Sequence, residues 1–343
     1  GGTRPAGRAA AVHRHHRVTG LDAGFYRQAV LFRRPRPEFP LVEKDVRDVT
    51  EDDLRGFDAI IHLAELSNDP LGQLDPALTR RINFEGSVRL ARLAKAAGVP
   101  RFLYSSSCSV YGIGEGDEIK TEASSVAPQT EYARCKVMVE RAVSELADES
   151  FSPLFLRNAT AYGPSPAMRF DLVLNNLAGH AHTSGRIVLT SDGTPWRPLV
   201  HVRDICAAFM AALDTPRERW HNQVLNVGSS SENFRVREIA EIVAHMYPGC
   251  ELTLGRRDPD TRSYRVSAEQ IREVLPSFQP VHTVADGARE LRETFEAVGL
   301  TRAVFEHPAF TRLARLRQLL ARGRLDADLR WHEVPVRRAE DVA

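Results

Sequence analysis

The chain has 343 residues, of which 43% are hydrophobic and 27% are charged, and its formal net charge is +1. These values are typical of a soluble globular protein that can bury a large core. A charge balance so close to neutral gives no overall field that attracts nucleic acid or a membrane surface, so we expect neither as a partner. No apolar run reaches the roughly 18 residues of a membrane-spanning helix, and we expect no leader sequence.

The four cysteines, Cys108, Cys135, Cys206 and Cys250, show no Cys-x-x-Cys spacing. This pattern favours reduced thiols in a cytoplasmic protein over a disulfide framework. It also argues against a structural zinc site, so we expect no bound metal.

From residue 18 onward, apolar runs alternate with helical patterns, which favours an α/β protein with a parallel sheet. Residues 18–22 read as a strand that ends in an acid, Asp22. Residues 58–64 form an apolar run bounded by polar residues, as expected of a strand buried on both faces. Further strands are predicted at residues 102–104, 154–157, 187–189 and 224–228, and an amphipathic helix at residues 88–97.

The strongest chemical signal lies between residues 101 and 136. The strand at 102–104 leads into Ser-Ser-Ser-Cys-Ser-Val-Tyr-Gly, and Tyr132 precedes Lys136 by four positions in a helical segment. This separation places both side chains on one helix face, about 5–6 Å apart at Cβ. An ammonium beside a phenol lowers the phenol's pKa toward the working range of a general base. Ser107, at the strand end, then holds the substrate alcohol.

A lone Tyr-x-x-x-Lys is common by chance, but here it follows a serine-rich strand end and Val-Tyr-Gly. Together these residues resemble the extended short-chain dehydrogenase/reductase family, in its nucleotide-sugar epimerase/dehydratase branch. The resemblance covers roughly residues 18 to 275 and includes Arg-Pro-Leu-Val-His-Val-Arg-Asp at 197–204. It implies a doubly wound parallel sheet of the Rossmann type with a smaller C-terminal substrate-binding region.

The N-terminus departs from the family pattern of a strand followed by Gly-x-x-Gly-x-x-Gly. Gly1 and Gly7 fall at the outer glycine positions, but Arg4 stands at the middle one, where a side chain crowds the approach of backbone to phosphate. No strand precedes them, so the first strand and glycine turn read as degraded or missing. An upstream frameshift, a misplaced start codon and a genuine loss of cofactor binding all explain this pattern.

The resemblance also implies a cofactor, NAD, and the residues that bind it. Asp22 would bind the adenosine ribose and favour NAD over its 2′-phosphorylated form. Glu65 departs from the small residue usual after its strand and is expected to place a negative charge near the pyrophosphate. The implied cofactor-binding residues are Gly1, Gly7, Asp22, Asp45, Val46, Leu63, Ala64, Asn83, Tyr132 and Lys136.

By the same resemblance, Ser107, Tyr132 and Lys136 are the catalytic residues, and the substrate is a nucleoside-diphosphate sugar. Its implied binding residues are Ser107, Cys108, Ser109, Asn158, Thr160, Asn175, Asn176, Leu177, Arg197, Arg257 and Asp260. Dehydratases of the branch carry an Asp-Glu pair directly after the hydroxyl residue. This chain has Cys108 and Ser109 there; neither does carboxyl acid–base work at ordinary pKa values, so elimination of water is disfavoured.

These observations favour an NAD-dependent epimerase that removes and returns a hydride at a sugar carbon, C4 by analogy, and that forms a homodimer. A ketoreductase or dehydrogenase of the same family, or a catalytically silent binding protein, stays open. The predicted regions are residues 1–157, a dinucleotide-binding domain with 1–17 atypical; 158–300, mainly substrate-binding; and 301–343, a helical extension and tail.

The extension contains a helical apolar stripe flanked by arginines, with Phe310, Leu313 and Leu316 among its apolar residues. Such a helix suits a membrane or a partner groove, but packing on its own domain with solvated arginines is the favoured interpretation.

Overall fold

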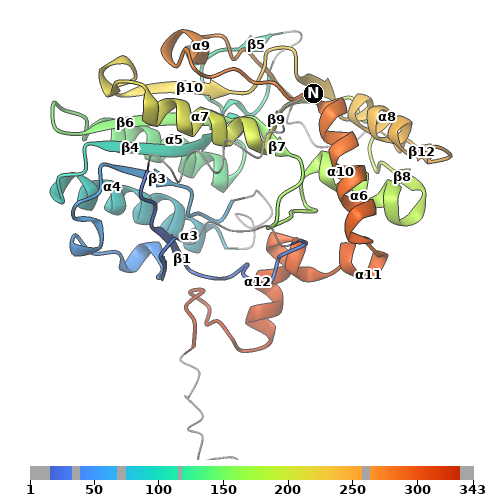
Figure 1. The fold of residues 1–343 in the computed structure, drawn as a ribbon, viewed down its shortest axis with the longest axis horizontal. Helices are drawn as coiled ribbons and strands as arrows, with labels where there is room; N and C mark the ends of the chain where they lie inside the picture. Colours follow the sequence, from blue (N-terminus) through green and yellow to red (C-terminus); the bar gives the residue numbers. More distant parts are fainter. Residues whose placement is uncertain (1–15, 33–38, 68–74, 115–117, 257–262, 333–343) are drawn as a thin grey trace, which may run out of the picture.

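The computed structural model describes residues 16–32, 39–67, 75–114, 118–256 and 263–332 (Figure 1). Residues 1–15 lie outside this part of the chain. The predictions for Gly1, Gly7 and the glycine turn therefore stay predictions.

A four-stranded parallel sheet forms the centre of the fold, in the strand order β10-β6-β4-β3. Its strands are β3 (Ala59–His62), β4 (Arg101–Ser107), β6 (Ser152–Asn158) and β10 (Gln223–Val227). All residues of β6 except the last are buried, because a central parallel strand has both faces covered. The predicted doubly wound parallel fold is confirmed.

A second parallel pair, β1 (Gly20–Asp22) with β2 (Leu41–Glu43), stands apart from this sheet. Among the described strands, β1 pairs only with β2 and β3 pairs only with β4. The β3 edge therefore keeps unpaired backbone groups in the described part of the chain, and the Ile61 side chain on it is 38% exposed.

Helices cover both faces of the central sheet. On one face, α4 (Ser87–Ala96) and α5 (Glu131–Ser144) pack against Phe102 and Tyr104. On the other face, α7 (Val202–Asp214) packs against Leu103. Alternate residues of β4 thus enter two different cores, as the two-residue period of a strand requires.

A smaller lobe lies beside the sheet and has its own core around Phe170 and Phe295. Its helices are α6 (Val173–Ser184), α8 (Val236–Met246), α10 (Val284–Val298) and α11 (Arg302–Phe305). Its strands are β7 (Thr160–Tyr162), β8 (Arg186–Val188), β9 (Trp196–His201), β11 (Asn233–Arg235) and β12 (Glu251–Thr253). Helix α10 approaches β7 closely at Gly287, where a Cβ atom would lie 2.2 Å from Tyr162 Cε2.

The remaining short elements connect these units. They are η1 (Val46–Asp48), η2 (Asp52–Leu54), α3 (Pro76–Thr79), η3 (Arg80–Gly86), η4 (Cys108–Tyr111), β5 (Ile119–Lys120), η5 (Arg217–Arg219), β13 (Arg265–Val266), α9 (Gln270–Val274) and η6 (Pro308–Phe310). In the residues that the structure describes, no helix has the length and apolarity needed to cross a bilayer.

The C-terminal helix α12 (Arg312–Ala321) packs on the N-terminal half of the molecule, where the Arg315 side chain donates to the Phe25 carbonyl at 3.1 Å (Figure 1). Leu316 and Leu319 are buried in the same core as Val46 and Val88. The helix therefore packs on its own chain, which is the favoured interpretation of its apolar stripe.

This packing makes the C-terminal helix a contributor to the stability of the N-terminal half. We expect Leu316→Ala to lower the free energy of unfolding by about 2–5 kcal/mol, because a fully buried leucine leaves a cavity. The exposed neighbour Arg317→Ala is the control and should change it by less than about 0.5 kcal/mol. Urea unfolding followed by circular dichroism measures both, and equal effects would contradict the packing.

Candidate active site

Three serines end strand β4 at the carboxyl edge of the sheet. Ser105 and Ser107 are partly exposed, and Ser106 between them is buried. The Ser107 oxygen accepts a hydrogen bond from the backbone N–H of Ser109 at 3.1 Å and so caps the turn η4. The backbone of the turn therefore positions the predicted catalytic hydroxyl.

Helix α5 brings Tyr132 and Lys136 to this strand end. The Lys136 ammonium nitrogen lies 5.4 Å from the centre of the Tyr132 ring. Lys136 is buried, whereas Tyr132 is partly exposed. Lys136 also donates a hydrogen bond to the carbonyl oxygen of Ser105. The spacing of the sequence predicts this arrangement, while the catalytic roles of the residues stay predictions.

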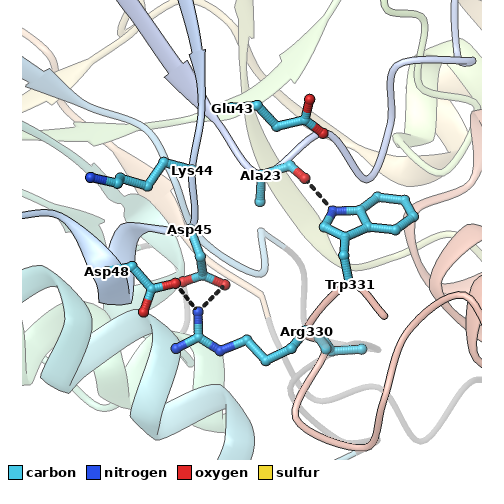
Figure 2. A pocket seen from close by; sticks show the side chains of 8 residues that line it. Ala23, Glu43, Lys44, Asp45, Asp48, Arg330 and Trp331 are labelled. Atoms are coloured by element: carbon cyan, nitrogen blue, oxygen red, sulfur yellow. Dashed lines mark hydrogen bonds and ion pairs between the residues drawn. The ribbon is translucent and has the colours of Figure 1, made fainter. Parts of the chain in front are cut away.

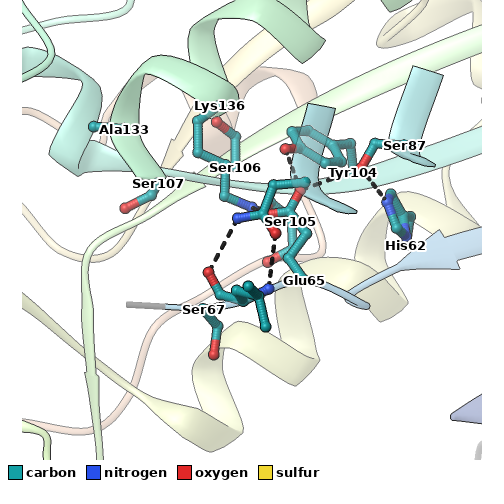
Figure 3. A network of polar contacts seen from close by, with 12 residues as sticks. His62, Glu65, Ser67, Ser87, Tyr104, Ser105, Ser106, Ser107, Ala133 and Lys136 are labelled. Carbon is teal, nitrogen blue, oxygen red and sulfur yellow. Dashed lines mark hydrogen bonds and ion pairs between the residues drawn. The ribbon is translucent and has the colours of Figure 1, made fainter. Parts of the chain in front are cut away.

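The Lys136 ammonium forms an ion pair that the sequence did not indicate. Its partner is the Glu65 carboxylate, at 2.6 Å, and the two side chains are only 5% and 3% exposed. The Tyr104 hydroxyl donates to the same carboxylate at 2.5 Å. Figure 3 shows Glu65, Lys136 and Tyr104 gathered at the end of β4. The expectation that Glu65 places its charge near the pyrophosphate is thus corrected, because its carboxylate turns inward to the lysine.

Burial and charge determine the protonation states in this network. Burial favours a neutral amine, but Glu65, Tyr132 and Glu140 together outweigh burial and hold the pKa of Lys136 above its ordinary value. Burial and Glu65 together raise the pKa of Tyr104 well above its ordinary value, so its phenol stays protonated and donates. Burial, with the Lys136 ammonium nearby, lowers the pKa of His62 to about 3. His62 is therefore neutral and bonds Ser87 at 2.7 Å.

The loop that carries Glu65 is held by Asn83. The Asn83 amide accepts from the Leu66 N–H at 2.8 Å and donates to the Leu66 carbonyl at 3.0 Å. Asn83 lies in η3, a π-helical stretch, and such stretches are frequent at functional sites. The loop also carries two predicted cofactor-binding residues: Leu63 is 61% exposed and Ala64 is partly exposed.

A buried network of Arg157, Glu140 and Tyr111 contacts Ser106, and we did not identify it from the sequence. The Arg157 guanidinium holds the Glu140 carboxylate at 3.0 and 2.6 Å, and Glu140 accepts from the Ser106 hydroxyl at 2.5 Å. Arg157 also donates to the Tyr111 hydroxyl at 3.0 Å. Arg157 ends an otherwise apolar strand run, and this charged residue was the signal that could have revealed the network.

The residues predicted to bind substrate around β4 and β6 differ in their placement. Cys108 is 1% exposed, and its thiol bonds the Arg157 carbonyl inside the core. Burial raises the pKa of this thiol far above its ordinary value. The amide nitrogen of Asn158 donates to Ser105 Oγ at 3.0 Å, and Thr160 is partly exposed. Within the described residues, Ser109 Oγ and Asn158 Oδ1 are buried without a hydrogen-bond partner.

The predicted diphosphate segment uses its polar groups within the protein. Asn175 accepts from the Gly163 N–H at 3.0 Å and donates to the Arg169 carbonyl at 3.0 Å, and Asn176 donates to the Phe170 carbonyl. Leu177 is buried in the core of the smaller lobe. Arg197 lies on β9 and donates to the Trp196 carbonyl. Arg257 and Asp260 lie outside the described residues.

A cavity of about 340 Å³ opens at the carboxyl ends of β1 and β2 (Figure 2). The predicted ribose residue, Asp22, ends β1, and its carboxylate accepts from the Gly24 N–H at 2.5 Å. Asp45 lines the cavity, with its carboxylate held by Arg47 at 2.9 and 2.7 Å. Val46 is buried in the core, so only Asp45 of this pair faces the cavity with its side chain.

These residues fit a dinucleotide at two places along the carboxyl edge. The cavity beside Asp22 and Asp45 is large enough for a nucleoside. At the other end, Glu65 and Ser105 take two of the three Lys136 N–H groups in the described structure, which leaves one for a ribose hydroxyl. No group of three or more His, Cys, Asp or Glu side chains that could hold a metal occurs in the described ranges.

Comparison with known proteins agrees with this geometry. The model of the NAD dependent epimerase/dehydratase family matches residues 8–228. A UDP-glucose 4-epimerase from Corynebacterium glutamicum is 27% identical over 261 residues, covering 71% of this chain and 78% of that protein. The structure of MoeE5 in complex with UDP-glucose and NAD is 25% identical, with a TM-score of 0.72, over 86% of this chain and 96% of that one.

A more distant structure, DesIV, a dTDP-glucose 4,6-dehydratase from Streptomyces venezuelae with NAD bound, has a TM-score of 0.74 at 22% identity. It covers 87% of this chain and 94% of its own. At this identity the likeness concerns the fold. The resemblance stated from the sequence motifs is confirmed.

The ion pair between Glu65 and Lys136 should be detectable in the stability of the protein. We expect Glu65→Gln to lower the free energy of unfolding by about 3–5 kcal/mol, because it leaves a buried ammonium uncompensated. The double variant Glu65→Gln/Lys136→Met should lose less than the single variant. As control, Glu51→Gln removes an exposed pair with Arg55 and should cost less than about 1 kcal/mol. A double variant no more stable than Glu65→Gln would contradict the pairing.

Proposed function

The chain belongs to the NAD-dependent epimerase/dehydratase family, and we propose that it is a 4-epimerase of a UDP-hexose. The observation that carries this proposal is the arrangement of Tyr132, Lys136 and Ser107 at the end of β4, with no carboxylic acid directly after the serine. The UDP-glucose 4-epimerase from Corynebacterium glutamicum supports the choice of substrate class. A homodimer stays a prediction.

In this proposal Ser107 of β4 and Tyr132 and Lys136 of α5 divide the proton transfer and the binding of the cofactor. Tyr132 takes the proton from the C4 hydroxyl, and Ser107 hydrogen-bonds the same oxygen while the proton leaves. Lys136 holds the nicotinamide ribose and places its charge beside the phenol, which favours the phenolate. Bound NAD supplies the hydride acceptor and donor. After the keto hexose has turned in the site, Tyr132 would return the proton to the C4 oxygen.

The residues after Ser107 favour epimerisation over loss of water. Elimination needs an acid and a base at neighbouring carbons. The Cys108 thiol is buried with a pKa far above its ordinary value, and Ser109 offers only a hydroxyl. Neither side chain supplies carboxyl chemistry, so the keto sugar keeps its hydroxyl groups.

One observation supports a second candidate, a protein that binds the nucleotide sugar without turnover. The Glu65 carboxylate already neutralises Lys136 at 2.6 Å, which weakens the pull of the ammonium on the Tyr132 phenol. The retained set of Tyr132, Lys136 and Ser107 argues for the enzyme, because a silent protein has no chemical need for it.

Replacement of the phenol distinguishes these candidates. We expect Tyr132→Phe to lower kcat for conversion of UDP-glucose by at least about a hundredfold, the scale of a general acid–base contribution, with little change in KM. Separation of the product epimer by chromatography measures the rate. Tyr247→Phe is the control, since this buried hydroxyl in the smaller lobe has no hydrogen-bond partner among the described residues. Equal kcat for Tyr132→Phe and the wild type would contradict the assignment.

The mass of the product tests the reaction type. Incubation with UDP-glucose and NAD should give a stereoisomer with the mass of the substrate, because no carboxylic acid follows Ser107. Mass spectrometry of the nucleotide-sugar fraction reports this directly. A product lighter by one water would mean elimination, and one differing by two hydrogens would mean a one-way oxidation or reduction.

A further inference from the structure

The outer wall of the cavity at β1 and β2 comes from the opposite end of the chain. Leu329, Arg330 and Trp331 face Ala23 and Asp45 across it. Figure 2 shows the indole of Trp331 and the guanidinium of Arg330 reaching toward the residues that follow the two strands. Two segments about 300 residues apart thus share one cavity, which lies outside Tyr132, Lys136 and Ser107.

The C-terminal wall is a built structure. Leu325 and Trp331 form a β-bridge, and the Asp326 carboxylate accepts from the backbone N–H groups of Asp328 and Arg330 at 2.9 and 2.8 Å. Leu329 adopts a positive φ of 55° within this turn, and its side chain is 3% exposed in the core. Because the turn is closed by its own hydrogen bonds and anchored by apolar burial, it presents Arg330 and Trp331 in defined positions.

Both wall residues are tied to the opposite side. The Trp331 Nε1–H donates to the Ala23 carbonyl at 2.6 Å, and the indole packs against Phe25 with ring centres 5.8 Å apart. Arg330 forms ion pairs with Asp45 at 3.4 Å and with Asp48. Trp331 nevertheless stays partly exposed, so part of the indole remains open to the cavity.

The charges around the cavity indicate the kind of group that fits. Glu43, Asp45 and Asp48 line it, against Lys44 and Arg330. The Lys44 ammonium is paired with the Asp53 carboxylate at 2.7 Å, so its charge is already compensated. A phosphate would meet an excess of carboxylates, whereas a neutral, planar base gains stacking on an indole and a guanidinium. The volume of about 340 Å³ suits a nucleoside rather than a whole dinucleotide.

We propose that Trp331 and Arg330 are cofactor-binding residues, and that the C-terminal turn 325–331 forms one wall of the site for the adenosine half of the dinucleotide. This inference rests on the proposed use of NAD. The adenine ring stacks against Trp331, while Arg330 neutralises the Asp45 and Asp48 carboxylates beside the base. Cofactor binding and the docking of the C-terminal segment then stabilise each other, because each supplies a surface that the other covers.

Calorimetric titration of the whole chain tests the proposal without any turnover. The probes are NAD and the fragment AMP, with UDP as a probe of the substrate side. We expect Trp331→Ala to weaken NAD and AMP by roughly tenfold or more, the effect of one lost base–aromatic stack, and to leave UDP unchanged. Arg322→Ala, an exposed arginine at the end of α12, is the control and should bind all three probes like the wild type.

A second variant distinguishes the loss of base stacking from the loss of the C-terminal turn. Trp331→Phe keeps an aromatic ring but lacks the N–H that bonds Ala23, so it should retain most of the AMP affinity that Trp331→Ala loses. Unchanged NAD and AMP affinity in Trp331→Ala would overturn the inference and leave the proposed epimerase intact. Failure of the wild type to bind NAD or AMP would overturn both. Weakening of UDP alongside NAD in Trp331→Ala would mean general unfolding and would also overturn it.

Discussion

The ion pair between Glu65 and Lys136 is the interaction on which the candidate active site depends. Both groups are almost fully buried, so neither charge is tolerable without the other. The Tyr104 hydroxyl donates to the Glu65 carboxylate, and the Ser105 carbonyl accepts from the Lys136 ammonium. The lysine is therefore placed from three elements at once: the loop after β3, strand β4 and helix α5. Its position beside Tyr132 is a property of this network more than of the helix alone.

The pair also changes the electrostatics of the proposed reaction. A lone ammonium favours the phenolate of Tyr132, whereas an ammonium paired with a carboxylate acts at short range mainly as a dipole. Lys136, the lysine of the proposed catalytic set, is thus charged, and the carboxylate beside it compensates part of that charge. A small residue at position 65 would leave that charge available to the phenol and to a ribose. Glu65 weakens the effect of the ammonium on the phenol, but it fixes the position of the Lys136 side chain.

The sequence predicted those parts of the site that depend on local spacing. Four positions on a helix place Tyr132 beside Lys136, and a polar strand end places Ser107 at the carboxyl edge. It was wrong about the direction of Glu65, because the partner of a buried carboxylate lies 71 positions away on another element. Cys108 was expected at the substrate, yet its thiol enters the core, because the strand ends at Ser107 and Cys108 begins the turn η4 with its side chain buried. The contact of Arg157 with Glu140, which supports Ser106, could not be predicted either, because it joins a strand and a helix in the folded protein.

The C-terminal segment shows the same limit on a larger scale. Its apolar stripe correctly predicted a packed helix, but no local pattern could indicate that Arg330 would meet Asp45 at 3.4 Å. That contact exists because Leu316 and Leu319 bury α12 in the core beneath η1 and so bring the following turn to the ends of β1 and β2. Hydrophobic packing of one helix therefore decides which charges and which aromatic ring border the cavity. The apolar face of α12 therefore determines which side chains line the cavity, although these side chains follow it by some fifteen residues.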